Sequence, residues 1–221
     1  MSKRFVETES VSDGVNWRVT NTSLWNFAHK IYGKCPKCGQ VTIIKANYEY
    51  CYRIEDARVQ CLHCAFYEDW NSEKIYGAAA GKAQQPCPNC GTKWLTAQIK
   101  IKNAKPVKDH TEVCCEVCGK TSYLSLTWHQ ECNASKPLDP YFRHPLWLQI
   151  ECAGEIFWAF NENHLNYLKS YVEADLREDD GRMSWSIVSR LPKWITSAKN
   201  RQNVLKAIAK LEKQIMEVNK K

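Results

Sequence analysis

The 221-residue sequence contains none of the motifs that identify several large enzyme classes. It has no Walker phosphate loop, no G-x-G-x-x-G fingerprint, no H-E-x-x-H helix and no G-x-S-x-G nucleophile elbow. The carboxylates that a metal-dependent nuclease would need are scattered, at Glu131 and in the run 178–180. A cysteine–histidine nucleophile stays open as an alternative, because its partners need only meet in space. We therefore expect that the protein is not an enzyme.

Long apolar runs are also missing. Nowhere do about 18 consecutive apolar residues occur, so we expect no membrane-spanning segment. The first ten residues, MSKRFVETES, contain no apolar stretch of the kind that a secretory signal needs. We therefore expect a cytoplasmic protein whose 12 cysteines bind metal in a reducing compartment, with disulfides as the alternative. Hydrophobic residues make up 44% of the chain and aromatic residues 11%, enough to bury a core.

Eight of the cysteines form four C-x-x-C pairs: Cys35/Cys38, Cys61/Cys64, Cys87/Cys90 and Cys115/Cys118. Twenty-two residues separate the first two pairs and 24 separate the last two, and the two units begin 52 residues apart. This spacing is typical of an internal duplication. An aromatic, strand-like segment follows each unit, AFYEDW in the first and KTSYLSLTW in the second.

Each unit offers four thiolates, and tetrahedral Zn²⁺ binds four soft ligands where two short turns meet at the metal. The glycine in CPKCG, CPNCG and CEVCG lets the chain turn sharply and direct N–H groups at sulfur. Four sulfur ligands leave no open coordination position, which indicates structural rather than catalytic zinc. We therefore predict two structural Zn²⁺ ions per chain, bound by Cys35, Cys38, Cys61, Cys64, Cys87, Cys90, Cys115 and Cys118.

The stretch HTEVCCEVCG contains three cysteines, one more than a knuckle needs. Cys115 and Cys118 have the required spacing and precede Gly119, so they are the predicted ligands, whereas Cys114 lies one residue too early. A third metal at His110 and Cys114, or at His129 and Cys132, would lack an evident second pair of ligands. Four cysteines therefore remain, and we expect each of them to be a small buried hydrophobic residue: Cys51, Cys114, Cys132 and Cys152.

Both cysteine units resemble zinc ribbons, the rubredoxin-like knuckle hairpins common in transcription, replication and translation proteins. The resemblance covers residues 34–70 and 86–128. It implies a structural metal, and ribbons of that broad class bind nucleic acid, bind proteins or brace a fold. Residues 145–212 are similar to a segment found beside zinc ribbons in uncharacterised bacterial proteins, which implies a bacterial or mobile-element origin and no activity.

Local patterns predict the elements around the ribbons. Ser23 is a candidate N-cap for a helix, LWNFAHKIY, that ends at Gly33. Its residues Trp25, Phe27 and Ile31 are expected to dock on the first ribbon, and base stacking is the alternative. The segment LWLQIECAGEIFWAF alternates apolar and polar residues around Ala153-Gly154, which predicts a β-hairpin. Asn cap candidates then open a helix whose buried face carries Leu165, Leu168, Val172 and Leu176.

All of the excess positive charge lies in residues 182–221, which contain 10 Lys+Arg and 2 Asp+Glu. Pro192 suits the first turn of one helix there, and Asn200 is a candidate cap for a second. The second helix places an apolar stripe opposite a basic one. The apolar residues are Val204, Ile208, Leu211, Ile215 and Val218, and the basic residues are Lys206, Lys210, Lys213, Lys220 and Lys221. Three interpretations fit: a solvated lysine face, phosphate contacts, or self-association through the apolar stripe.

The leading hypothesis is a non-enzymatic, zinc-stabilised module that binds DNA or RNA. Its phosphate contacts are assigned to Lys199, Arg201, Lys206, Lys210 and Lys213. The alternative is a protein-interaction adaptor or a structural subunit of a larger complex, with the ribbons as docking surface. The predicted fold class is α+β, with an N-terminal strand/helix arm (1–33), ribbons at 34–82 and 83–134, a β-hairpin plus helix (145–181) and a basic helical tail (182–221).

Overall fold

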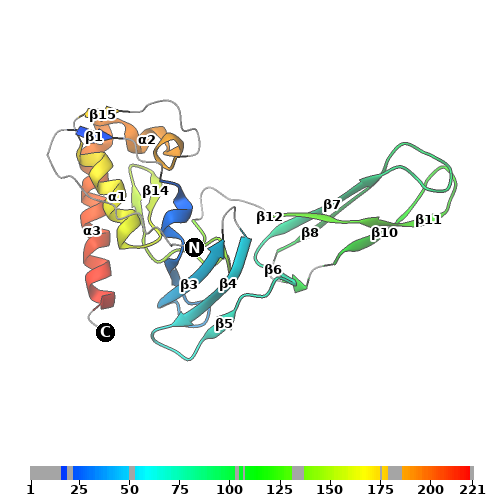
Figure 1. The fold of residues 1–221 in the computed structure, drawn as a ribbon, viewed down its shortest axis with the longest axis horizontal. Helices are drawn as coiled ribbons and strands as arrows, with labels where there is room; N and C mark the ends of the chain where they lie inside the picture. The colour runs from blue at the N-terminus through cyan, green and yellow to red at the C-terminus, as the bar shows by residue number, and fades with distance from the viewer. Residues whose placement is uncertain are drawn as a thin grey trace, which may run out of the picture. The chain divides into compact units, whose positions relative to one another are not determined.

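The structure is a computed structural model that describes residues 16–18, 22–49, 53–102, 105–106, 108–130, 137–174, 176–178 and 186–219. These residues form two compact units (Figure 1). The helical unit contains the described residues up to 28 and from 148 onward, and the ribbon unit contains those from 29 to 147. The fold class is α+β, as predicted. Among the described residues, no helix combines the length and the hydropathy that crossing a membrane requires.

Helices dominate the described part of the helical unit. Its elements are β1 (Asn16–Arg18), η1 (Leu24–Phe27), β13 (Gln149–Cys152), β14 (Glu155–Trp158), α1 (Glu162–Glu173), β15 (Leu176–Glu178), η2 (Val188–Arg190), α2 (Lys193–Thr196), η3 (Ala198–Asn200) and α3 (Arg201–Asn219). β1 pairs with β15 in parallel, and β13 pairs with β14 antiparallel. Helices α1 and α3 lie side by side (Figure 1).

The predicted hairpin around Ala153-Gly154 is confirmed. Cys152 pairs with Glu155 across the turn, where the φ angles of Ala153 and Gly154 are 55° and 81°. Two consecutive positive φ angles are those of a type I′ turn, whose twist matches that of the flanking strands. The alternation of apolar and polar residues in this segment therefore predicts the β13-β14 hairpin correctly.

Helix α1 also begins where the sequence predicts. Asn161 is its N-cap, and its side chain accepts the backbone N–H of His164 at 2.9 Å. Leu165, Leu168 and Val172 are buried as expected. Leu176 is a correction, because it lies in strand β15 and not on the helix.

Helix α3 presents its predicted apolar face to the interior of the helical unit. The buried residues are Val204, Ile208, Leu211 and Ile215, and Val218 is half-buried. At the first residue of the helix, the guanidinium group of Arg201 donates hydrogen bonds to the carbonyl oxygens of Val172, Glu173 and Ala174. Carbonyls at a helix C-terminus lack intrahelical partners, so Arg201 satisfies the end of α1 and ties α3 to it.

The predicted helix from Ser23 to Gly33 is wrong over its second half. Only the 3-10 turn η1 forms, closed by a capping box between Ser23 and Asn26, and the chain then continues as strand β2 (Lys30–Lys34). β2 pairs with β3 (Val41–Glu49). Gly33 is needed in this strand, since a Cβ there would lie 2.9 Å from the Thr42 hydroxyl oxygen. Pairing with distant residues overrides the local helical pattern.

The two ribbons pair their strands differently, although their cysteine layout is duplicated. The first ribbon is a four-stranded antiparallel sheet in the order β2-β3-β4-β5. The second has a three-stranded sheet, β12-β7-β8, and a separate hairpin, β10-β11. β6, which follows the sheet of the first ribbon, pairs antiparallel with β9, which lies between β8 and β10 of the second ribbon. The bounds are β4 (Arg53–Cys61), β5 (Tyr67–Asp69), β6 (Lys74–Ile75), β7 (Ala79–Gln85), β8 (Leu95–Ile101), β9 (Lys105–Pro106), β10 (His110–Cys114), β11 (Thr121–Ser125) and β12 (Thr127–Gln130).

The second ribbon has a small core between its two sheets. Ala83, Leu95 and Leu124 are buried there together with Cys87 and Cys115. The sheet of the first ribbon buries larger side chains: Ile31, Ile44 and Val59 are completely inaccessible to solvent. Residues of the segment that follows the second ribbon are also completely buried. The second ribbon therefore depends more strongly on its cysteines for stability.

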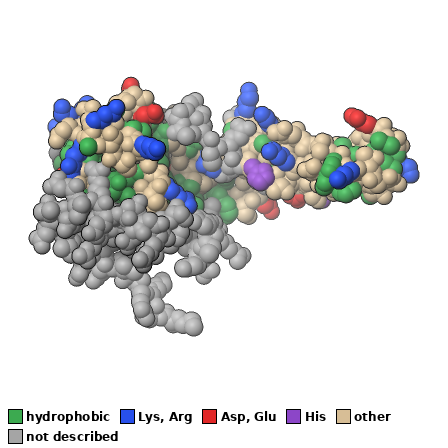
Figure 2. All heavy atoms as spheres, turned by 90° about the horizontal axis from the view of Figure 1, so that it is seen from above, with side chains coloured by type: hydrophobic (Ala, Val, Ile, Leu, Met, Phe, Trp, Pro, Cys, Tyr) green, Lys and Arg blue, Asp and Glu red, His purple; other side chains and the backbone are tan. Residues whose placement is uncertain are grey.

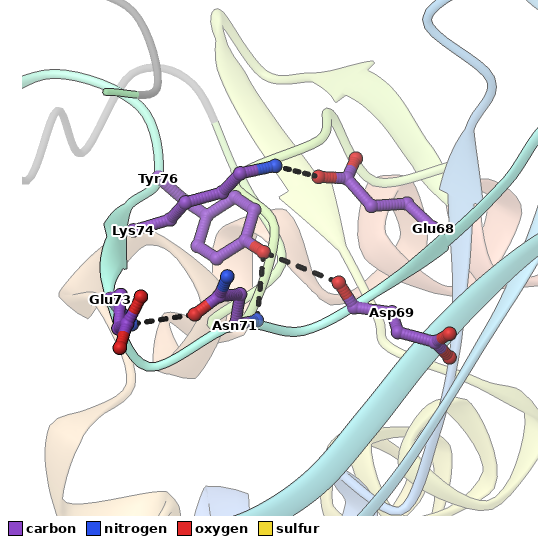
Figure 3. A network of polar contacts seen from close by, with 6 residues as sticks. All are labelled: Glu68, Asp69, Asn71, Glu73, Lys74 and Tyr76. Atoms are coloured by element: carbon purple, nitrogen blue, oxygen red, sulfur yellow. Dashed lines mark hydrogen bonds and ion pairs between the residues drawn. The ribbon is translucent and has the colours of Figure 1, made fainter. Parts of the chain in front are cut away.

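A polar network orders the connection between β5 and β6 (Figure 3). The Tyr76 hydroxyl donates to the carbonyl oxygen of Asp69 at 3.4 Å and accepts the backbone N–H of Asn71 at 3.0 Å. Lys74 pairs with Glu68, with 3.4 Å between Nζ and Oε1. Since the Tyr76 side chain is buried, the chain between the ribbons is held by packing as well as by hydrogen bonds.

The segment after the second ribbon turns back towards β2 around a buried carboxylate. Asp139 is fully inaccessible; its Oδ1 accepts the backbone N–H groups of Tyr141 and Phe142 at 2.9 and 2.7 Å. Its Oδ2 accepts the N–H of His144 at 2.6 Å. Beyond the turn, the N–H of Trp147 donates to a carbonyl of β2 at 2.8 Å. Asp139 therefore closes the turn that adds this segment to the first ribbon.

His164 is a buried histidine held among aromatic rings. Its ring stacks on Phe27 with 5.0 Å between centroids, and Trp158 and Phe160 pack edge-on against it. The ring Nδ1 accepts the backbone N–H of Phe160 at 3.2 Å, so this nitrogen is unprotonated. Burial lowers the pKa of His164 to about 3. The folded protein therefore keeps a neutral imidazole.

We predict that this histidine makes the helical unit acid-sensitive. An unfolded histidine titrates near pH 6.5, so below that pH the unfolded chain binds a proton that the folded chain excludes. The stability is complete above pH 6.5 and falls by up to about 1.4 kcal/mol per pH unit towards pH 3. In the variant His164→Asn, the side-chain amide oxygen should replace Nδ1 as the hydrogen-bond acceptor. The amide group does not titrate in this pH range. Urea unfolding of both proteins should show that the wild type loses about 2 kcal/mol more than the variant between pH 8 and 5. Parallel pH dependences would contradict this assignment.

Candidate metal centres

The first cysteine cluster lies at one end of the first ribbon. Cys35 follows strand β2 and Cys61 ends strand β4, so the sheet delivers both knuckles to the same place. The Sγ atoms of Cys35 and Cys64 lie 3.7 Å apart, and those of Cys38 and Cys61 lie 3.6 Å apart. All four Sγ atoms lie within 4.8 Å of one another. The predicted first ligand set is therefore brought together.

The second cluster has the same arrangement. Cys87 follows strand β7 and Cys115 follows strand β10. The Sγ–Sγ distances are 3.8 Å between Cys87 and Cys118 and 3.7 Å between Cys90 and Cys115. These four sulfur atoms also lie within 4.8 Å of one another. Both predicted ligand sets are thus confirmed as clusters.

The sulfur spacing fits a tetrahedral zinc ion. With Zn–S bonds of about 2.3 Å, the edge of a regular sulfur tetrahedron measures about 3.8 Å. The measured separations of 3.6 to 3.8 Å match that edge. A disulfide would require about 2.05 Å, so the alternative of disulfide bonding is excluded for these eight cysteines. The donor set of four thiolates is the one that structural Zn²⁺ prefers.

Backbone geometry shapes three of the four knuckles in the same way. Gly39, Gly91 and Gly119 have φ of 70°, 73° and 69°, a region that only glycine enters without strain. Each donates its N–H to the carbonyl oxygen of the first cysteine of its knuckle, at 2.8 to 3.0 Å. The fourth knuckle has Ala65 at this position, without a positive φ. In that knuckle the N–H groups of His63 and Cys64 both reach Cys61 Sγ at 3.3 Å.

Backbone hydrogen bonds favour the thiolate form, which a metal requires, at one buried sulfur of each cluster. Burial raises the pKa of Cys61, but the N–H groups of His63 and Cys64 outweigh it, and the pKa falls to about 7. The N–H groups of Cys118 and Val117 lower the pKa of Cys115 to about 6. Each cluster therefore contains one buried sulfur that ionises near neutral pH and is ready to bind a cation.

One contact to a ligand was missed in the sequence. The hydroxyl of Thr92 lies 3.0 Å from Cys90 Sγ and lowers the pKa of that thiol. Sequence alone offers a single signal for it, the threonine directly after C-x-x-C-G. Cys90 is exposed, so this hydrogen bond stabilises the sulfur with the least shielding from solvent in the second cluster.

The remaining cysteines do not join either cluster. The thiol of Cys114 lies 3.5 Å from the carbonyl oxygen of Gly119, on the exposed side of the knuckle, so its predicted exclusion from the metal holds, while its expected burial is wrong. Cys152 is buried as expected, and burial raises its pKa. Cys51 and Cys132 lie outside the described residues. Among the described residues, no third cluster forms at His110 or His129.

Three of the five predicted nucleic-acid contacts lie together on α3. Lys206, Lys210 and Lys213 are exposed, and Lys199 is exposed just before the helix, in η3. Arg201 is different, because its guanidinium group bonds to the end of α1. The residues Lys220 and Lys221 lie outside the described part of the chain.

Both centres are closed sites. Each has four cysteines and, among the described residues, no histidine or carboxylate ligand, and the first cysteine of every knuckle is buried. Such a site holds two turns together and leaves no position for substrate or water at the metal. Comparison with family models, with curated proteins and with solved structures finds no match for the chain. The two four-cysteine clusters themselves therefore assign metal binding, in tandem knuckles like those of zinc ribbons.

Proposed function

We propose that the protein is a non-enzymatic, zinc-stabilised nucleic-acid-binding module of bacterial type that contacts phosphates through helix α3. The observation that carries the proposal is the exposed lysine stripe on the side of α3 opposite its buried face. Clustered lysines release counterions from the phosphate backbone and so bind nucleic acid of any sequence.

The geometry of the stripe supports phosphate contacts. Lys206, Lys210 and Lys213 recur at intervals of four and three residues, so they lie on one side of the helix. At 1.5 Å per residue they extend over about 10 Å. The nearest acidic residue along the helix, Glu212, is engaged elsewhere, because it pairs with Lys169 at 2.9 Å. Glu217, four residues after Lys213, lies on the same side and offsets one charge, so the stripe of three lysines keeps a net positive charge.

The two other residues predicted to contact nucleic acid, Lys199 and Arg201, have different roles in this proposal. Lys199 is exposed in η3 and extends the stripe before the helix begins. Arg201 serves the interface of α3 with α1, where it fixes the direction of the lysine stripe rather than meeting phosphate. The apolar face of α3 is buried within the helical unit, which favours phosphate binding over self-association as the use of this helix.

Neutralising the stripe should weaken binding strongly. In Lys206→Gln, Lys210→Gln, Lys213→Gln we expect at least a tenfold loss of affinity for DNA or RNA at 50 mM salt, together with a flatter salt dependence. The slope of log K against log salt should decrease by about 2 to 3, since each phosphate contact contributes about 0.7 to 0.9. Fluorescence anisotropy with labelled duplex DNA, single-stranded DNA and RNA measures both quantities.

The matched control for this experiment carries the same change of charge elsewhere. Lys93→Gln, Lys108→Gln, Lys120→Gln removes three exposed lysines of the second ribbon and should change the affinity by less than threefold. Binding that does not respond to salt, or no binding at about 10 µM protein, would argue against the proposed function.

Protein docking is the second candidate function, and one observation favours it. At the knuckle end of the second ribbon, Trp94, Val117 and Tyr123 are 52%, 72% and 69% exposed. Figure 2 shows hydrophobic side chains gathered at the surface of this end. Exposed aromatic and aliphatic groups in one region are typical of protein contact surfaces. A partner that co-purifies after nuclease treatment would favour this candidate over nucleic-acid binding.

A further inference from the structure

The three-stranded sheet β12-β7-β8 of the second ribbon has an outward face that neither the cysteines nor the core uses. Side chains alternate along β7: Ala79, Gly81 and Ala83 point to the other face, towards the core side, and Ala80 and Lys82 point outward. The core side packs against β10 and β11. The side chains of the outward face therefore do not belong to the core of the second ribbon.

Three basic side chains surround one small residue on this face. Ala80 is paired with His129 of β12 on one side and with Lys100 of β8 on the other. With strands about 4.8 Å apart, the backbones of His129 and Lys100 are about 10 Å apart, with Ala80 midway. Lys82 lies two residues further along β7 on the same face, about 7 Å from Ala80. Ala80 itself is buried, whereas His129, Lys100 and Lys82 are exposed.

The charge of this face is of one sign. Thr127 and Gln98, the cross-strand neighbours of Lys82, are uncharged and exposed, and the described residues of this face include no aspartate or glutamate. By contrast, the exposed face of hairpin β10-β11 carries Glu112. The ion pairs found among the described residues join Lys74 to Glu68 and Lys169 to Glu212, so neither involves this face.

We propose that this face binds the phosphate backbone of a single-stranded nucleic acid, with one phosphate seated over Ala80 between His129, Lys100 and Lys82. The inference rests on the proposed function, which it deepens by adding a second contact surface and naming the strand state. Ammonium and imidazole N–H groups donate to phosphate oxygens, and the hydroxyl and amide groups of Thr127 and Gln98 are further donors.

The shape of the site favours a single strand. The proposed phosphate site over Ala80 is one strand wide, because it lies on β7 between the two outer strands, β12 and β8. The helices and two-stranded ribbons that enter a duplex groove are raised elements, and a sheet face of this kind presents none. A flat, basic, polar surface instead suits a flexible strand that follows the side chains with its phosphates.

The test compares two double variants of the full-length, zinc-loaded protein. Lys82→Gln with Lys100→Gln removes two charges from the face, and Lys93→Gln with Lys120→Gln removes two from the knuckle end of the same ribbon. Anisotropy titrations use a labelled 15-nucleotide dT strand, a U strand of the same length and a 15-base-pair duplex. We expect the first variant to lose about tenfold in affinity for the dT and U strands at 50 mM salt, with a salt slope flatter by about 1.4. The second variant should stay within twofold of the wild type.

A further variant, Thr127→Glu, places a carboxylate beside Lys82 and should lower single-strand affinity to a similar extent. Zinc content and unfolding midpoint should match the wild type in every variant, because all the altered positions are exposed. Affinities of the first double variant and of Thr127→Glu that both equal those of the control would overturn the inference. An equal or larger loss on the duplex would overturn the assignment to single strands.

The outcomes also separate this inference from the function proposed for α3. If only the α3 triple variant weakens binding, the proposed function stands and the sheet face is excluded. If only the sheet variants weaken binding, the sheet face is the contact surface and the α3 stripe is excluded. Absence of all binding would overturn both.

Discussion

Replacing Cys87 by serine should unfold the second ribbon and leave most of the first ribbon folded. The core of the second ribbon consists of Ala83, Leu95 and Leu124 together with Cys87 and Cys115, so the metal and its ligands supply much of what holds its two sheets together. Structural zinc sites contribute on the order of 10 kcal/mol to folding, which is comparable to the net stability of a whole domain. Few other buried contacts compensate for that loss here.

The first ribbon should respond less to the equivalent change. Its sheet has four strands and buries Ile31, Ile44 and Val59 completely, and the turn at Asp139 adds further buried contacts. In Cys35→Ser we therefore expect loss of the metal and disorder of the knuckles, with protection retained in the middle of β3 and β4. Burial of each large aliphatic side chain contributes about 1.5 to 3 kcal/mol, which this sheet retains without its metal.

Native mass spectrometry and hydrogen exchange measure both effects. The wild type should contain two zinc ions, and each of the two variants should contain one. Exchange in β7, β8, β10 and β11 should become fast in Cys87→Ser. The matched control is Cys114→Ser, which changes the exposed thiol next to Cys115 and should keep both ions. A Cys87→Ser protein whose second ribbon remained protected from exchange would refute the structural role of this centre.

Removing the Asp139 carboxylate should be the most destabilising change away from the cysteines. Asp139→Ala leaves three buried backbone N–H groups without an acceptor, at Tyr141, Phe142 and His144. Each unsatisfied buried group costs about 1 to 3 kcal/mol, so we expect a loss of about 4 kcal/mol in the ribbon unit. The change should also release the segment that bonds to β2, because the turn is what directs Trp147 to that strand.

A graded series makes this prediction specific. Asp139→Asn keeps an oxygen for the N–H groups of Tyr141 and Phe142 but turns a donor towards the N–H of His144, so it should lose about half as much as Asp139→Ala. Asp109→Ala removes an exposed carboxylate of the same unit and should change stability by less than about 0.5 kcal/mol. Urea unfolding followed by hydrogen exchange in β2 measures the series. Equal stability of the two Asp139 variants would show that the turn does not depend on these hydrogen bonds.

Features with a fixed short-range signature were predictable from the sequence. The metal ligands follow from C-x-x-C spacing because a knuckle is a local turn, and the exclusion of Cys114 follows from the same spacing. The type I′ hairpin at Ala153-Gly154 and the apolar face of α3 likewise depend on residues close together in the chain. Periodicity reports such elements well because all their partners lie within a few residues.

Features that depend on distant partners were not predictable. Residues 30–34 show a helical pattern in isolation, but they form β2 because β3 and the segment around Leu146 offer strand partners. The burial of Asp139 has no local signature, since an Asp-Pro pair reads as an ordinary exposed turn. The sheet face around Ala80 depends on which strands flank β7, and β12 reaches it from nearly 50 residues along the chain. Neither cross-strand neighbours nor their charges can be derived before that pairing is known.

The different strand pairing of the two ribbons has a consequence for how such repeats change over time. Sulfur separations agree to within 0.2 Å between the two centres, yet one repeat builds a continuous sheet and the other a divided one. Four-cysteine geometry thus constrains the knuckles alone, and the segments between the knuckles differ in their strand pairing. We therefore expect that the segments between the knuckles of one repeat tolerate insertions or changes of surface charge without loss of its metal site.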